Sequence, residues 1–315
     1  MPGPNTTYSN FYLSNEVEDQ FNSHLNLQQF CTVDNNLVGT PGMKRKINVY
    51  RATNGTQKLA ITQGNTQSIT VGYTPKEYEI LLAQNRFEYY DEEAMTDPMI
   101  VPVGMRHAGT DMFNTVNADI FAEFNKATQV VVTAALDFAA FADAQSIFNL
   151  EAIQGVNFFA FVSPADVANL RKTLKDDLKY VEAFVRNGYI GTVAGVNLYT
   201  KKDAVTGTIC TATKQAVTLF NKKGVEVEQV IGGKRSETAA NVRLNTIFTR
   251  KYYLAALTDE TKAVKIIKGS AAVTTDTTVT SGKTYYEASG NGYVAVTPEA
   301  SDNPKTKGWY EITAA

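Results

Sequence analysis

Residues 157–200 constrain the fold of this chain more than any other stretch of its sequence. An apolar, aromatic run over residues 157–162 is typical of a short strand that is buried on both faces. Ser163 follows at the N-cap position of a helix, with Pro164 at the first helical position and Asp166 where a capping box has its acid. Apolar residues then recur at steps of three and four, which predicts one buried helical stripe: Val167, Leu170, Leu174, Leu178, Val181 and Val185.

Glycines mark the end of the same stretch. Gly188 stands where the helix is expected to stop, and Gly191 and Gly195 interrupt the segment that follows. Residues 196–199 then continue as a strand. The stretch therefore predicts a strand–helix–strand unit, which by spacing alone fits any α/β protein and contains no catalytic motif.

The composition of the chain excludes several classes of protein. Its 315 residues are 43% hydrophobic, enough for one large domain with additions or for two domains. The net charge of -2 leaves no basic field of the kind that drives sequence-independent binding to nucleic acid. No apolar run approaches the length of a membrane span, and residues 1–15 lack the pattern of a signal peptide. We therefore expect a protein made in the cytoplasm, with no membrane partner.

Cysteine and histidine usage argues against a disulfide framework and against a metal site. The chain has two cysteines, Cys31 and Cys210, and two histidines, His24 and His107. The cysteines stand far apart in unrelated contexts, so we expect free thiols and a reducing compartment. Two histidines cannot supply a histidine-rich metal site, and we expect neither a metal nor a cofactor.

Residues 1–40 read as an extended arm that is polar and rich in Asn, Ser and Thr. The arm has too little apolar surface to fold alone. Its scattered aromatic residues, among them Phe11, Phe21 and Phe30, need a partner surface, which another subunit would supply. The alternative is a terminus that simply frays.

The next part of the chain alternates polar and apolar residues. Turn signals within residues 44–75 predict a long hairpin with a polar tip, in which Lys58 lies. Residues 77–90 read as a further strand, closed by the acidic run at 91–93. From about residue 105 to 124 the apolar residues recur with helical spacing, which predicts a long helix with a broad apolar face.

The second half of the chain mixes short strands with helices. A helix is expected over residues 137–149, with Phe138 on the same apolar side as Phe141, Ala144 and Phe148. A Lys-Lys-Gly turn is expected at 222–224. Further strands are expected at residues 130–132, 208–213, 216–220, 241–257 and 263–267. The composition then shifts, and residues 269–315 read as a small, turn-rich β module that holds the only tryptophan, Trp309.

The order of these elements resembles that of the tailed-phage major capsid proteins with the Hong Kong 97-type fold, an α+β fold. Specific points of likeness are the Phe161-Val162-Ser163-Pro164 entry into a helix and the glycines at 188, 191 and 195 around Ile190. Others are Asn241-Val242-Arg243, followed by Tyr252-Tyr253-Leu254-Ala255. Together these points cover roughly residues 15–267, and their order along one chain is more specific than any one of them.

The resemblance implies a division of the chain into parts. Residues 1–40 would be the N-terminal arm, residues 41–268 the capsid body and residues 269–315 an appendage beyond the usual pattern. The body would contain an E-loop hairpin at about 45–75, a spine helix of the peripheral domain at about 105–126 and an axial domain at about 160–240.

The resemblance also implies a function. The chain would be a major capsid (coat) protein of the virion, assembling as hexamers and pentamers into an icosahedral shell that encloses phage DNA without strong specific binding. A separate scaffolding protein is an expected partner, because the arm is short and polar, and a portal is a further expected partner. The candidate subunit-interface residues are Phe11, Phe21 and Phe30 on the arm, Lys58 on the hairpin, and Tyr189 and Ile190 near the axial loops. Some family members join subunits through a lysine–asparagine isopeptide bond, for which Lys58 is the obvious candidate, although a lone exposed lysine is usually a solvated charge.

Three alternatives to the capsid interpretation remain open. An encapsulin-type nanocompartment shell shares the fold and differs in needing no scaffold. A β-rich surface adhesin fits the Thr- and Tyr-rich tail but not the two capped helices in the middle of the chain. An enzyme is disfavoured, because the adjacent acids at 91–93 and 176–177 point in different directions and no nucleophile, zinc or phosphate motif is present. We name no catalytic residue.

Overall fold

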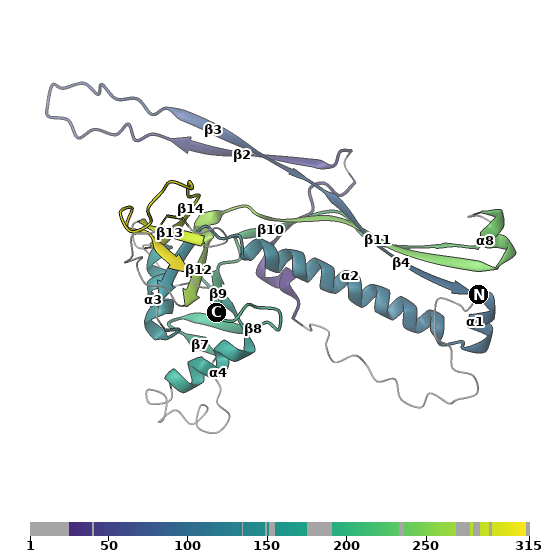
Figure 1. The fold of residues 1–315 in the computed structure, drawn as a ribbon. Coiled ribbons are helices and arrows are strands. Elements are labelled where there is room, and N and C mark those ends of the chain that lie inside the picture. The colour runs from purple at the N-terminus through teal and green to yellow at the C-terminus, as the bar shows by residue number, and fades with distance from the viewer. Residues whose placement is uncertain are drawn as a thin grey trace. The chain divides into compact units, whose positions relative to one another are not determined.

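The computed structural model describes residues 25–39, 41–133, 135–148, 150, 155–174, 191–232, 236–268, 278–279, 284–289 and 292–312 (Figure 1). The described residues form two compact units. Unit 1 contains Asp34–Met95 and Phe220–Leu254, and unit 2 contains the residues up to Val33, Thr96–Leu219 and the residues from Ala255 onward. Both units mix strands with helices, so the α+β class is confirmed.

Unit 1 contains most of a four-stranded sheet with the strand order β1-β10-β11-β4. The strands are β1 (Thr32–Asp34), β10 (Val217–Val230), β11 (Leu244–Leu257) and β4 (Leu81–Tyr90). The antiparallel register of β11 and β4 runs from Leu244 opposite Tyr90 to Tyr253 opposite Leu81. Two short helices, α1 (Asp91–Thr96) and α8 (Glu237–Asn241), belong to the same unit, and α8 was not predicted. The strands β2 (Lys44–Ala52) and β3 (Val71–Glu79) form a separate two-stranded sheet, which we call the ribbon.

Three sequence predictions for unit 1 need correction. The strand expected at residues 77–90 is interrupted at Ile80, whose side chain is buried between the end of β3 and the start of β4. The turn expected at 222–224 is absent, because β10 continues through it as one strand beside β11, and pairing with a long neighbour overrides a local turn preference. The acidic run at 91–93 begins α1 rather than merely closing a strand, and Glu93 Oε2 accepts a hydrogen bond from the Tyr90 N–H.

Unit 2 is built on a nine-stranded sheet with the order β15-β13-β14-β5-β12-β9-β6-β8-β7. Its strands are β5 (Gln129–Thr133), β6 (Phe158–Val162), β7 (Thr192–Val193), β8 (Val196–Thr200), β9 (Thr208–Ala212), β12 (Ala263–Lys268), β13 (Thr284–Ser289), β14 (Gly292–Val296) and β15 (Tyr310–Ile312). Strands β6 and β8 run parallel, as do β12 and β5. The core beside this sheet includes Phe141, Phe158, Leu170, Ile209 and Ile266, all at most 1% exposed.

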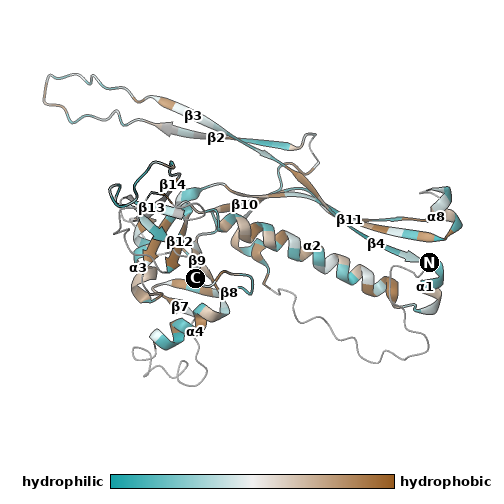
Figure 2. Ribbon diagram, viewed as in Figure 1, coloured by the Kyte–Doolittle hydropathy of each residue, from teal (hydrophilic) through white to brown (hydrophobic). Residues whose placement is uncertain are grey.

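The helices of unit 2 are α2 (Ile100–Phe124), α3 (Phe138–Ile147) and α4 (Pro164–Thr173), with short 3₁₀ turns η1 (Leu27–Phe30) and η2 (Glu260–Lys262). Polar and apolar residues alternate around α2 along its whole length (Figure 2). The buried side chains of α2 are Met112, Val116, Asn117, Ile120 and Phe124. Within the described part of the chain, no helix combines the length and the hydrophobicity that a membrane crossing requires.

The strand–helix entry at residues 158–166 is confirmed. All five residues of β6 are buried, as expected for a strand covered on both faces. Ser163 is the N-cap of α4 and its side chain accepts a hydrogen bond of 3.1 Å from the Asp166 N–H, with Pro164 at the first turn. The end of the predicted helix, including Leu178, Val181, Val185 and Gly188, lies outside the described residues.

The other two predicted helices exist with shifted details. Helix α2 begins at Ile100 instead of about residue 105, because Pro102 in the first turn costs the helix no hydrogen bond. Phe138 is 56% exposed, so its predicted place on the buried side of α3 is wrong. At 100° per residue, Phe138 lies roughly 90° from the centre of the stripe that Phe141, Ala144 and Phe148 form.

The tail residues beyond 283 extend the sheet of unit 2. Strand β14 pairs antiparallel with β5, with Tyr293 opposite Val130, and β13 pairs with both β14 and β15. Tyr286 packs against Val130 and Ile267 of the main sheet. The aromatic rings of Tyr285 and Trp309, both buried, lie 6.0 Å apart.

Candidate assembly surfaces

The ribbon pairs Lys44 with Glu79 at one end and Ala52 with Val71 at the other. The Thr53 N–H donates to the Thr70 carbonyl and the Ile80 N–H to the Met43 carbonyl, which marks 53–70 and 43–80 as hydrogen-bonded pairs. Because bonded and non-bonded pairs alternate in an antiparallel ladder, the pair of Asn48 and Pro75 is a non-bonded one. The Pro75 nitrogen, which carries no hydrogen, therefore faces the outer edge of β3 and leaves the ribbon's own ladder intact.

One face of the ribbon changes from charged to aromatic along its length. Near its base, Lys44 pairs with Glu79 and Lys46 with Glu77, each at 3.2 Å and largely exposed to solvent. Farther out, Tyr50 and Tyr73 lie opposite each other with ring centroids 5.9 Å apart. These two rings are 66% and 63% exposed, and Val71 beside them is 62% exposed. A single chain therefore leaves an aromatic surface of the ribbon in water, which makes this face a candidate interaction surface.

The tip of the ribbon spans residues 53–70 and contains no strand. Gly55 meets the backbone of Ile69 so closely that an added Cβ would lie 2.7 Å from the Ile69 nitrogen, which fixes glycine at this crossing. Lys58 is exposed and lines a hollow of about 550 Å³ together with Gln57, Leu59, Gln63, Gly64 and Thr66. Ile61 is 95% exposed, so the tip also presents apolar surface.

The base of the N-terminal arm is held by Asn117 of helix α2. The Asn117 side chain is 1% exposed and uses both of its polar ends. Its Oδ1 accepts from the Leu27 N–H and its Nδ2 donates to the Leu25 carbonyl, each at 3.1 Å. Since a buried amide must be satisfied, this pair of hydrogen bonds fixes where the arm leaves unit 2.

Phe30 anchors the same segment through its ring. It lies 4.5 Å from Tyr199, 4.9 Å from Phe159 and 5.4 Å from Phe161, measured between ring centroids. The side chain is 7% exposed within the single chain. Phe30 is therefore an anchor of the chain's own core, with little surface left for a neighbouring subunit.

A buried carboxylate ties the start of helix α4 to a loop distant in sequence. Asp166 is fully buried, and its Oδ2 accepts from the Ser163 hydroxyl at 2.8 Å and from the Gly207 N–H at 2.9 Å. The expected capping box is thus altered, because this carboxylate reaches Gly207 and the Ser163 hydroxyl instead of the N-cap backbone. Loop 201–207 is held against α4 by this contact. Lys201, 3% exposed, forms an ion pair with Asp203 at the start of the loop.

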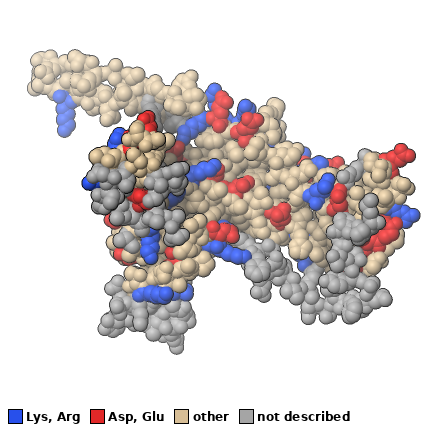
Figure 3. Space-filling view, viewed as in Figure 1, with Lys and Arg blue, Asp and Glu red and all other residues tan. Residues whose placement is uncertain are grey.

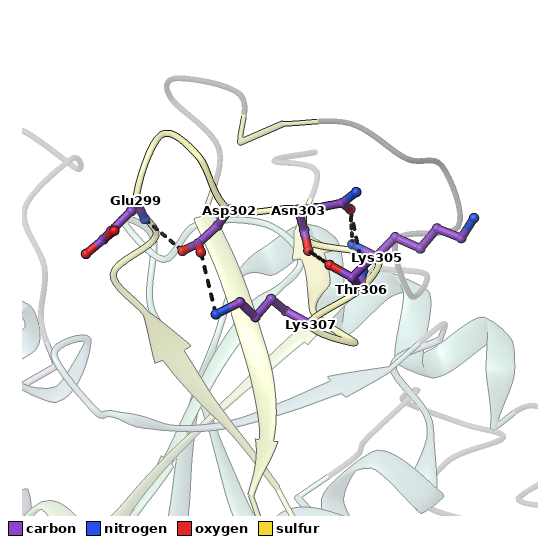
Figure 4. A network of polar contacts seen from close by, with 6 residues as sticks. All are labelled: Glu299, Asp302, Asn303, Lys305, Thr306 and Lys307. Carbon is purple, nitrogen blue, oxygen red and sulfur yellow. Dashed lines mark hydrogen bonds and ion pairs between the residues drawn. The ribbon is translucent and has the colours of Figure 1, made fainter.

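The loop before β15 is stiffened by a set of short-range polar contacts (Figure 4). Asp302 accepts from the Glu299 N–H at 3.0 Å and forms an ion pair with Lys307 at 3.5 Å. Asn303 accepts from the Lys305 N–H, and its carbonyl accepts from the Thr306 hydroxyl. All of these bonds join neighbours along the chain, so they shape the loop without creating a site.

Nothing among the described residues suggests catalysis. In that part of the chain, no group of His, Cys, Asp and Glu is arranged to hold a metal ion. Acidic and basic side chains are interspersed on the face shown in Figure 3, with no field of one sign. The two cysteines are separate, buried thiols, which donate to the backbone carbonyls of Gln28 and Phe124.

Both thiols are expected to be unreactive in the folded chain. Burial raises the pKa of Cys31 to about 11 and that of Cys210 to about 12. Because the thiolate is the nucleophile, neither residue should react with a disulfide reagent at pH 8, whereas both should react at once in denaturant. A Lys58→Cys variant, with an exposed third thiol, is the matched control. Equal labelling rates for all three thiols would contradict the burial.

The same shifts give a pH dependence. The pKa values of both thiols are raised above the 9.0 of an exposed thiol, so their contribution to stability is complete below pH 9. It should be lost progressively as the pH rises from 9 toward about 12.

The predicted interface residues fall into two groups. Phe11, Phe21, Tyr189 and Ile190 lie outside the described residues. Of the other two, Lys58 is exposed on the ribbon tip, and Phe30 is buried in unit 2. The sequence did not single out Asn117, Asp166 as a loop anchor, or the pair of Tyr50 and Tyr73. Strict alternation in β2 and β3 was the one signal that would have placed both tyrosines on one face.

In both sequence and fold, the chain is similar to phage capsid proteins. No family model matches the chain. The major capsid protein of Staphylococcus phage phiMR11 is 24% identical over 263 residues, which cover 82% of this chain and 92% of that protein. Among solved structures, the capsid of cyanophage Pam1 matches with a TM-score of 0.66 at 9% identity, covering 82% of this chain and 96% of that chain. The mature capsid of bacteriophage PhiM1 matches with a TM-score of 0.64 at 12% identity, covering 82% of this chain and 91% of that chain.

At these identities the solved structures establish only the fold. The similarity in sequence comes from the phiMR11 protein, which also matches 82% of this chain. The exposed ribbon and the lack of a chemical site among the described residues agree with a part in assembly. The chain has the Hong Kong 97-type fold of phage capsid proteins, and its sequence is similar to that of a phage major capsid protein over 82% of its length.

Proposed function

We propose that the chain is a phage major capsid protein, a structural component of the virion shell. We propose further that its β2–β3 ribbon is the E-loop, which lies against a neighbouring subunit in the shell and clasps it. The observation that carries this proposal is the aromatic face formed by Tyr50, Tyr73 and Val71, more than 60% exposed at each residue. An isolated two-stranded hairpin is marginally stable in water, so a ribbon of this length needs a surface to lie on. In a homo-oligomeric shell, that surface belongs to another copy of the chain.

The remaining parts take the roles that the resemblance implied. Helix α2 is the spine helix, and residues 1–40 are the arm, whose base is held at Asn117. The loops of unit 2 between residues 160 and 219 belong to the axial domain around the five-fold and six-fold axes. Residues 220–240, which the sequence also assigned to the axial domain, lie in unit 1 with β10 and α8. Residues 269–315 are an appendage whose strands lengthen the sheet of unit 2.

The shell is built of hexamers and pentamers of this chain. A separate scaffolding protein and a portal take part in its assembly. The packaged DNA is enclosed without a strong specific contact, in keeping with the net charge of -2. Candidate interface residues Phe11 and Phe21 on the arm, and Tyr189 and Ile190 near the axial loops, contribute to contacts between subunits.

Shortening the ribbon tests this role. In the variant, residues 54–69 are replaced by Asn-Gly, a two-residue turn that can join the hydrogen-bonded pair of Thr53 and Thr70 in register. The unassembled chain should keep its circular dichroism spectrum and melting temperature, because the tip lies outside both cores. The yield of closed shells, measured by sedimentation and negative-stain microscopy with the scaffolding protein supplied, should fall by about tenfold or more.

The matched control is Lys58→Ala, which keeps the tip and removes its one charge. It should assemble as the unaltered chain does, since an exposed lone lysine contributes little. Full shell yield from the shortened ribbon would reject the clasp.

A further inference from the structure

The two outer edges of the ribbon differ in what they can bind. Residues 71, 73, 75, 77 and 79 of β3 direct their backbone N–H and C=O groups outward, and Pro75 at the centre has no N–H to offer. On β2 the outward residues are 44, 46, 48, 50 and 52, and each has both groups. The edge of β3 is thus interrupted, as is common for edges that natural proteins protect. The edge of β2 is complete.

A second open edge lies on β10. Strand β11 occupies one side of β10 and β1 the other, and β1 is only three residues long. The residues after β1 contact β10 at Asn221 and Lys222. From Lys223 to Val230, no described strand lies on the outer edge. Val225 and Val227 in this segment are 56% and 54% exposed. A long, open edge with exposed valines is a template for an added strand.

The charges of the two edges are complementary. Strand β2 carries no acidic residue, and its residues Arg45 and Arg51 lie on the face opposite Tyr50. The open segment of β10 carries Glu226 and Glu228, with Lys223 at its start. Glu226 and Glu228 likewise lie on the face opposite Val225 and Val227, so pairing that brings tyrosines and valines together also brings these opposite charges to one face. Each of these acids already pairs within its own chain, with Lys223 and Arg250 respectively. Such exposed pairs exchange partners at little cost, so they do not prevent a new contact.

Charge also argues against the N-terminal arm as the strand that pairs with the open edge of β10. Residues 1–24 contain Glu16, Glu18 and Asp19 and no lysine or arginine. Like charges placed opposite each other in a sheet are unfavourable, so an acidic segment fits an acidic edge poorly. The basic β2 edge is the better match.

We propose that the outer edge of β2 pairs with the outer edge of β10, over residues 223–230, in a neighbouring copy of the chain. The ribbon of one subunit then continues the β10-β11-β4 sheet of the next. This inference rests on the proposed clasp and names the surface that receives it. It places the exposed tyrosines of the ribbon beside Val225 and Val227, which covers apolar surface that each single chain leaves in water.

Asn48→Pro is the variant that tests the pairing. Because Asn48 belongs to a non-bonded pair, a proline there leaves the β2–β3 ladder whole and removes only an outward N–H, as Pro75 does on β3. Asn48→Ala is the matched control, since it changes the side chain and keeps the N–H. The proline variant should raise the concentration of chain that shell assembly requires by about tenfold, with the alanine variant close to the unaltered chain.

Hydrogen exchange on the unaltered protein gives a readout that does not depend on any variant folding. Peptides covering residues 223–230 and 46–52 should exchange about tenfold or more slowly in shells than in the unassembled chain. Unchanged exchange at 223–230 would overturn the pairing, even if the shortened ribbon fails to assemble as the clasp requires. Protection at 223–230 that survives in Asn48→Pro shells and vanishes when residues 1–24 are removed would also overturn it, by assigning the edge to the arm. Normal shell assembly by the variant with the shortened ribbon would instead reject the proposed contact between the ribbon and a neighbouring subunit.

Discussion

Phe161→Ala is expected to lower the free energy of unfolding of unit 2 by about 4 kcal/mol. The Phe161 ring is 1% exposed and lies within 5.9 Å of Phe30, Phe121, Phe124 and Phe159, measured between ring centroids. Its removal deletes a large buried surface and opens a cavity that the surrounding rings cannot readily collapse around. Because such a loss is a large share of the stability of a domain, most of the variant chain should fail to form shells.

Phe138→Ala is the matched control for this prediction. It makes the same substitution in the same unit, but at a ring that is 56% exposed. Its effect should stay within about 0.5 kcal/mol. Urea unfolding of the unassembled chains, followed by circular dichroism, measures both values. Similar losses for the two variants would contradict the assignment of Phe161 to the core.

The strand–helix entry was predictable from the sequence because its signals are local. The apolar run of β6, the cap at Ser163 and the proline after it need no information from elsewhere in the chain. The ribbon was also predictable, since alternation and turn residues mark a hairpin within a short stretch. These local patterns, placed in order, were enough to indicate the capsid fold.

The features that were missed depend on residues far apart in sequence. The Lys-Lys-Gly segment looks like a turn until β11 is placed beside it, and then it continues as a strand. Asn117 is an ordinary polar helix residue until the backbone of residues 25–27 is laid across it, about ninety residues away in sequence. The pairing of β14 with β5 likewise joins residues that no local pattern connects. Propensity is a weak prior wherever such tertiary contacts decide the outcome.

The candidate surface shows the same division. Exposure of the ribbon tip and of Lys58 followed from the polar composition of residues 53–70. The difference between the two outer edges of the ribbon could not be predicted from composition, because it depends on which residue pairs of β2 and β3 are hydrogen-bonded. Pro75 in a sequence suggests an edge strand, and only the register shows that its nitrogen faces outward.

Asp166→Ala is expected to cost about 3 kcal/mol, close to the effect at Phe161 although far fewer atoms are removed. The carboxylate is fully buried and accepts from both the Gly207 N–H and the Ser163 hydroxyl. Removing it leaves two donors without an acceptor in a place that water does not reach, and an unpaired buried donor carries its full desolvation penalty. Loop 201–207 should then detach from α4, so hydrogen exchange at Gly207 should accelerate more than exchange in β6.

Two further variants separate the hydrogen bonds of Asp166 from its bulk. Asp166→Asn keeps the shape and one acceptor oxygen, so it should lose clearly less stability than the alanine variant. Asp143→Ala removes an exposed carboxylate from α3 and should change the free energy of unfolding by no more than about 0.5 kcal/mol. If Asn and Ala at position 166 are equally destabilising, the charge of the carboxylate matters more than its acceptor geometry. If both variants at position 166 unfold like the unaltered chain, the tie between α4 and loop 201–207 contributes nothing to the fold, and this part of unit 2 must be held by its apolar core alone.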